Sequence, residues 1–139
     1  MEITANALQT VESNQNVLFT ETPVCGSCSI IHRDGSGLIT LRGITNQCRA
    51  RFKAFFSGNI GLPTGGTVGP ISIAIAINGE AVPSSTMIST PAAVEEFANV
   101  ASAVYLDVPV ECCLTISVKN TSAQAIDIQN ANLIIERVA

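Results

Sequence analysis

The 139-residue sequence is short of charged and aromatic residues. Asp, Glu, Lys and Arg make up 13% of it, about half of their usual share in a soluble domain. Tryptophan is absent, and tyrosine and histidine each occur once. Seven basic and eleven acidic residues give a net charge of −4, whereas binding to nucleic acid by phosphate neutralisation needs a basic surface. We therefore expect no nucleic-acid partner.

Long apolar runs are also absent. No run reaches the roughly 18 residues of a membrane-spanning helix, and the first residues, Met1–Asn6, lack the basic segment that begins a signal peptide. We therefore expect neither a membrane partner nor export by a signal peptide.

What the sequence has in excess is β-branched side chains. Val, Ile and Thr together account for 40 of the 139 residues, and their stiff side chains favour extended strands. Short runs of this kind recur between clusters of Gly, Pro and Asn. The pattern predicts an all-β protein, a jelly-roll sandwich of two antiparallel sheets with about eight to ten strands. We expect one such domain over residues 16–139, preceded at 1–15 by a polar arm or edge strand.

Local signals predict several details of this sandwich. A first strand is expected at Asn16–Thr22. Hairpin turns are expected at Asp34-Gly35 and Asn78-Gly79, because these dipeptides tolerate the positive φ of tight turns. The segment Pro91–Phe97 could form a helical turn or an extended crossover. In the last strand the apolar residues change face, which predicts a bulge near Gln129–Asn132.

Two strands lack charge over most of both of their faces. In Ile71–Ile77 one face is entirely Ile and the other carries Ser and Ala, while in Val100–Val108 Ala and Tyr lie opposite the Val and Leu residues. A face toward water would usually carry Lys, Glu or Thr, so both faces should be covered. A loop or the N-terminal arm could cover them, or another copy of the chain could.

A third strand, over residues 50–57, combines Arg51, Lys53 and Phe55 on one face. This could be a binding patch or the rim of a subunit contact. We expect a homo-oligomer, and its contact residues are predicted to be Phe55, Ser72, Ala74, Ala76, Ala101, Ala103 and Tyr105.

Five cysteines allow several kinds of chemistry. Cys25 and Cys28 have the spacing of half a zinc site, to which Cys48 could add a ligand. Disulfides among these three and free thiols are alternatives, and an odd number of cysteines excludes complete pairing within the chain. The adjacent Cys112 and Cys113 should point to opposite faces of a strand and not form a bridge. We expect no metal and no cofactor, with Cys25, Cys28 and Cys48 as the candidate ligands if one binds.

Catalytic patterns are missing. His32, the single histidine, lies next to the Asp34-Gly35 turn and is expected to be solvated. The sequence has no Gly-x-Ser-x-Gly motif and no phosphate-binding Gly loop, and its single histidine could not form the His cluster of a cupin-like metal site. The motif Asn120-Thr121-Ser122 matches a glycosylation acceptor but is interpreted as a turn. We therefore expect no enzyme activity.

Three stretches together resemble the tumour-necrosis-factor and complement globular-head superfamily. They are a Gly-rich turn with a short strand at Asp34–Leu41, a Phe-rich strand at Ala50–Ser57, and an aliphatic strand ending in Asn-Gly within Val68–Glu80. The stretches Asn16–Thr22 and Thr86–Glu96, with the His32–Gly37 turn, are similar to small bacterial and bacteriophage jelly-roll proteins of head-decoration, fibre-tip and exosporium type.

The resemblance implies a ten-stranded jelly roll that forms a tight homotrimer on the surface of a particle or cell. We expect a non-enzymatic structural virion protein, a trimeric bacteriophage capsid-decoration or fibre module at the virion surface. Its partners would be itself and other capsid or fibre proteins. The alternative is a receptor- or glycan-binding module at a fibre tip or on a bacterial cell or spore surface, with Tyr105 and Phe97 as candidate contacts for a host surface glycan.

Overall fold

The computed structural model describes residues 1–26, 29–43, 49–109 and 113–139. Within these ranges the chain forms short and long strands and one 3-10 turn, η1, and no helix there is long and apolar enough to cross a membrane. The elements are β1 (Glu2–Ala5), β2 (Gln9–Val11), β3 (Glu21–Val24), β4 (Ile30–His32), β5 (Ile39–Arg42), β6 (Arg49–Gly61), β7 (Ile71–Ile77), β8 (Glu80–Ala81), η1 (Pro83–Ser85), β9 (Met87–Ser89), β10 (Phe97–Pro109), β11 (Cys113–Asn120) and β12 (Ile126–Arg137).

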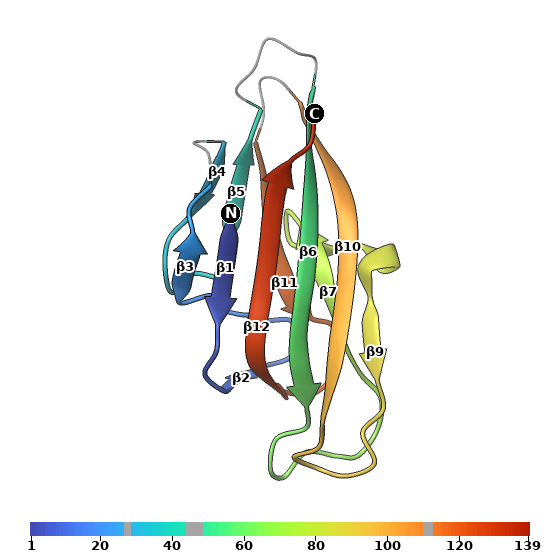
Figure 1. Cartoon of the computed structure of the whole chain (residues 1–139). Helices are drawn as coiled ribbons and strands as arrows, with labels where there is room; N and C mark the ends of the chain where they lie inside the picture. Colours follow the sequence, from blue (N-terminus) through green and yellow to red (C-terminus); the bar gives the residue numbers. More distant parts are fainter. Residues whose placement is uncertain (27–28, 44–48, 110–112) are drawn as a thin grey trace.

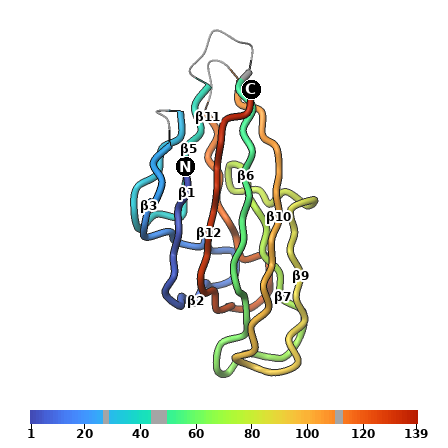
Figure 2. Tube along the Cα trace, in the orientation of Figure 1, coloured from blue at the N-terminus to red at the C-terminus, as the bar shows by residue number. Residues whose placement is uncertain are grey.

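The strands form two six-stranded antiparallel sheets packed face to face (Figures 1 and 2). One sheet has the order β10-β6-β12-β1-β3, with β2 paired to β12. The other has the order β4-β5-β11-β7-β8, with β9 paired to β7. In Figure 1 the first sheet is the near layer, in which the long strands β10, β6 and β12 lie side by side. The predicted all-β sandwich of two antiparallel sheets is confirmed, and short strands such as β2 and β8 raise the strand number above the predicted range.

The first fifteen residues contribute two strands, β1 and β2, to the first sheet. β1 is an interior strand between β12 and β3, and its Ile3 is fully buried. Ile3 and Ala5 alternate with Glu2 and Thr4, which is the period of a strand with one core face. The many polar residues around this short pattern led to the expectation of an arm.

The strand predicted at Asn16–Thr22 is largely a crossing between the sheets. Isolated bridges join Asn16 to Lys119 of β11 and Phe19 to Ser36 in the β4–β5 connection, both on the side of the second sheet, and the next strand of the first sheet begins at Glu21. The apolar residues of this segment do indicate burial, because Val17 and Phe19 are both buried. The segment is a connection that passes along the edge of the core, and it is not a paired strand.

The core lies between the sheets and follows the predicted inward faces. Phe52 and Phe56 of β6 are fully buried, as are Ile73 and Ile75 of β7. The ring of Phe56 meets that of Phe19 edge to face, with centroids 6.5 Å apart.

Turns and the bulge also follow the local signals. Asn78 and Gly79 have φ of 51° and 87° and join β7 to β8, while Gly35, with φ of 91°, lies between β4 and β5. The register between β12 and β6 shifts between Gln129 and Asn132, as predicted. The segment before β10 connects β9 of the second sheet to β10 of the first, and it contains bends and a turn, so it is neither a helix nor an extended crossover.

Candidate functional site

The outward side chains of β10, β6 and β12 form one continuous surface, which we call the outer face. It exists because residues with even numbers on β6 face the core and those with odd numbers face away. Residues directly opposite each other on neighbouring strands have side chains on the same side, so the outer face divides into rows that run across the three strands.

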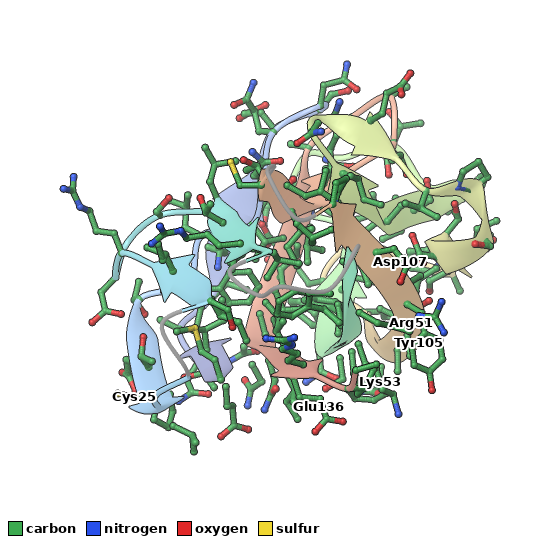
Figure 3. The ribbon with its side chains drawn as sticks, turned by 90° about the horizontal axis from the view of Figure 1, so that it is seen from above. Cys25, Arg51, Lys53, Tyr105, Asp107 and Glu136 are labelled. Carbon is green, nitrogen blue, oxygen red and sulfur yellow. The ribbon has the colours of Figure 1, made fainter. Side chains whose placement is uncertain are left out.

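Two rows at one end of the outer face carry charge. Arg51 lies opposite Asp107, and its guanidinium donates to both carboxylate oxygens, at 2.8 and 3.2 Å. The hydrogen bond and the charge of Asp107 raise the pKa of Arg51 above its ordinary value, and the nearby Tyr105 adds to this. In the next row Lys53 lies between Tyr105 and Glu136. Figure 3 shows these five side chains gathered along one side of the molecule.

The two middle rows are uncharged. Ala103, Phe55 and Ile134 form the first, and Ala101, Ser57 and Asn132 form the second. Ile134 is 39% exposed, and Tyr105, directly beyond this apolar row, is 67% exposed. Large apolar side chains thus meet water at the centre of a flat surface.

The opposite end of the outer face carries amides. Asn99, Asn59 and Gln129 form a row, and the Asn99 amide nitrogen donates to the Asn59 side-chain oxygen at 3.2 Å. One row further, the exposed Phe97 lies against Gly61, where a Cβ would come within 3.0 Å of the ring and 2.7 Å of a backbone oxygen. A larger residue could not occupy position 61 without moving Phe97.

The structure divides the predicted contact residues between two opposite surfaces. Phe55, Ala101, Ala103 and Tyr105 share the outer face. The other three, Ser72, Ala74 and Ala76, lie on β7 in the second sheet, where the chain itself buries Ala74 and Ala76 completely. These two alanines offer no surface to a partner, because neighbouring strands already enclose their small side chains. The amide row was missed, although its alternate polar residues on three strands were a possible signal.

The structure describes only one of the three cysteines named as candidate metal ligands. Cys25 is exposed just after β3, while Cys28, Cys48 and Cys112 lie outside the described residues. Over the described ranges, no three His, Cys, Asp or Glu side chains lie close enough together to hold a metal ion.

His32 is buried, so the expectation of a solvated histidine is wrong. Its side chain has no exposed area, its Nε2 donates to the Ser36 carbonyl at 3.0 Å, and its ring meets that of Phe19 edge to face. The Nδ1 atom has no hydrogen-bond partner and lies 3.8 Å from the Asp34 carboxylate. The hairpin folds over the crossing segment that carries Phe19, and this long-range contact leaves no local signal.

Asn120 is a second buried polar residue. Its amide nitrogen donates to the carbonyls of Val11 and Gln124, both at 2.9 Å, and its side-chain oxygen accepts from the Ser122 amide at 2.9 Å. The side chain is fully enclosed. The motif is therefore a structural turn, as predicted, in which the asparagine holds three chain segments together.

The similarity of this chain to known proteins is one of fold. No protein-family model and no curated sequence matches the chain. Among solved structures, it is similar to the globular domain of zebrafish complement 1qA, with a TM-score of 0.63 and 8% identity over 96% of this chain and 93% of that one.

Two sugar-binding proteins have lower structural similarity to this chain. A CBM35 module of Cellvibrio japonicus Abf62 has a TM-score of 0.42 and 9% identity, covering 100% of this chain and 98% of that one. The EclA C-terminal domain has a TM-score of 0.43 and 14% identity, covering 95% and 80%. The chain therefore has the fold of the complement globular domain, a jelly roll of two antiparallel sheets.

Proposed function

We propose that the chain is a non-enzymatic structural module that assembles as a homotrimer through its outer face. The observation that carries this proposal is the uncharged centre of that face, where Phe55 and Ile134 lie beside two alanines and next to the exposed Tyr105 of the adjoining row. Monomeric proteins rarely leave such a patch open, and subunit contacts place an apolar centre inside a polar rim.

The size of the outer face suits a subunit contact. β6 and β10 have 13 residues each, about 40 Å of extended chain, and three strands spaced about 4.8 Å apart are about 14 Å wide. The face therefore offers about 600 Å², close to the roughly 800 Å² that each partner contributes to a standard interface. In a threefold ring each contact joins two different patches, so one side of the outer face of one subunit would meet the other side of the outer face of the next.

Replacing Ala103 by Arg is expected to convert the trimer to a monomer. The new side chain would place an unpaired charge in the apolar row, opposite Phe55. Light scattering coupled to size exclusion should give three times 14.5 kDa for the wild type and 14.5 kDa for the variant. Ala123→Arg, at an exposed position in the β11–β12 connection, is the matched control and should remain trimeric. A monomeric wild type would overturn the proposal.

We further propose display of this trimer on a particle surface, as a capsid-decoration or fibre module of a bacteriophage. The low charge of the chain and the resemblance of its short motifs to such phage proteins support this role. Mass spectrometry of particles purified from cells that carry the gene would test it. The chain should then be present in a copy number divisible by three, and its absence from intact particles would contradict the role.

The amide row gives some support to a second function, binding of a neutral glycan. Asn59, Asn99 and Gln129 could hydrogen-bond sugar hydroxyls between the exposed rings of Phe97 and Tyr105. This site would use the same face as the trimer contact. A glycan array should therefore show selective binding by the monomeric Ala103→Arg chain that is lost with Asn59→Ala, and equal signals from the two would exclude the site.

A further inference from the structure

Lys53 and Glu136 form an unusual pair on the outer face. They lie directly opposite each other on β6 and β12, as Arg51 and Asp107 do on β6 and β10. Arg51 and Asp107 make a bidentate ion pair, but across the described ranges no ion pair or hydrogen bond joins the side chains of Lys53 and Glu136. Both side chains thus remain available to groups outside the chain (Figure 3).

The order of the rows indicates how two copies can meet. Tyr105 in the charged row and Asn99 in the amide row are six residues apart on β10, which is about 20 Å. A twofold axis that lies in the contact plane and runs across the strands would bring the charged end of one copy over the amide end of the other. A rotation axis parallel to the strands keeps every row at its own level, so that charge meets charge and the apolar row meets its copies.

We propose, on the basis of the trimer proposed above, that Lys53 of one subunit pairs with Glu136 of the next. The two residues occupy one row, so rotation about an axis parallel to the strands keeps them at the same level with opposite charge. After a slip of one row, about 7 Å along the strands, one of the two charges would face the uncharged Phe55 row, and the other would face the row in which Arg51 and Asp107 already pair with each other. The pair therefore fixes the relative level of the subunits, and the apolar row supplies the attraction.

Charge reversal tests this pair. Lys53→Glu and Glu136→Lys should each raise the concentration at which the trimer dissociates by about tenfold or more, because each variant places like charges together. The double variant Lys53→Glu/Glu136→Lys should return this concentration to within about threefold of the wild type. Glu80→Lys, an exposed reversal on β8 of the other sheet, is the control and should leave it unchanged.

Salt dependence gives an independent measurement on wild-type protein. The wild-type trimer should dissociate at a higher concentration in 0.5 M than in about 0.05 M NaCl, and the neutral variant Lys53→Met/Glu136→Met should have a smaller salt dependence. This comparison holds even if a single reversal impairs folding, which circular dichroism would reveal.

The outcomes separate this inference from the proposed function. A wild-type trimer that tolerates both single reversals, or single reversals that the double variant does not rescue, would overturn the pair and leave the trimer standing. A wild-type chain of 14.5 kDa would overturn both.

Discussion

Replacing Phe56 by Ala is expected to lower the free energy of unfolding by about 3–5 kcal/mol, the usual cost of removing a buried aromatic ring. The ring is fully enclosed and meets Phe19 edge to face. It also lies over Gly58, where a Cβ would approach its Cζ to 3.1 Å. The space is closely filled, so the backbone of a paired β6 can collapse only a little into the cavity. Urea denaturation followed by circular dichroism would measure the loss.

The neighbouring residue provides a matched control. Phe55 has the same side chain on the same strand but points to the outer face. In the monomeric Ala103→Arg background, Phe55→Ala should lower the unfolding free energy by less than Phe56→Ala does, since Phe55 is only partly buried whereas Phe56 is fully buried. In the wild-type background it should weaken the trimer. Equal losses of monomer stability for the two variants would contradict the assignment of Phe56 to folding and Phe55 to assembly.

Replacing Asn120 by Ala is expected to cost about 3–5 kcal/mol, because three buried partners lose their hydrogen bonds at once. These partners are the carbonyls of Val11 and Gln124 and the amide of Ser122. Asp at this position would keep the acceptor for Ser122 but would turn an oxygen toward two carbonyls, so Asn120→Asp should be at least as destabilising near neutral pH.

Thermal and urea unfolding would measure both Asn120 variants. Asn6→Ala is the control, since Asn6 is exposed and its side chain makes no hydrogen bond to the described residues. That variant should stay within about 0.5 kcal/mol of the wild type. A loss below about 1 kcal/mol for Asn120→Ala would mean that water replaces the three bonds.

Local sequence rules predict the parts of this fold that depend on neighbours in the chain. The alternation in β6 and β7 identifies the core residues Phe52, Phe56 and Ile73, and the turn at Asn78-Gly79 follows from its need for positive φ. The loss of phase in the last strand predicts the bulge before Asn132. Each of these signals acts within a few residues.

The features that could not be predicted from the sequence depend on which segments meet in space. Ala74 and Ala103 both lie on an uncharged second face, but only the sheet order shows that the chain encloses Ala74 and leaves Ala103 exposed. The burial of His32 depends on a crossing segment more than ten residues away. The pairing of strands is set by the whole sheet, so the predicted contact residues could not be assigned to one surface from the sequence.

The place of β1 between β12 and β3 has a consequence for how the chain acquires its structure. Glu2 pairs with Ile134, so a segment that is made before the rest of the domain needs a partner that is made after nearly all of it. Folds dominated by such distant pairings close slowly, on the millisecond to second scale, because a long loop must be ordered first. Until β12 is made, the sheet also lacks the strand that joins β6 to β1. We therefore expect the domain to finish folding only after β12 has been made, with the apolar side of β6 open to association until then.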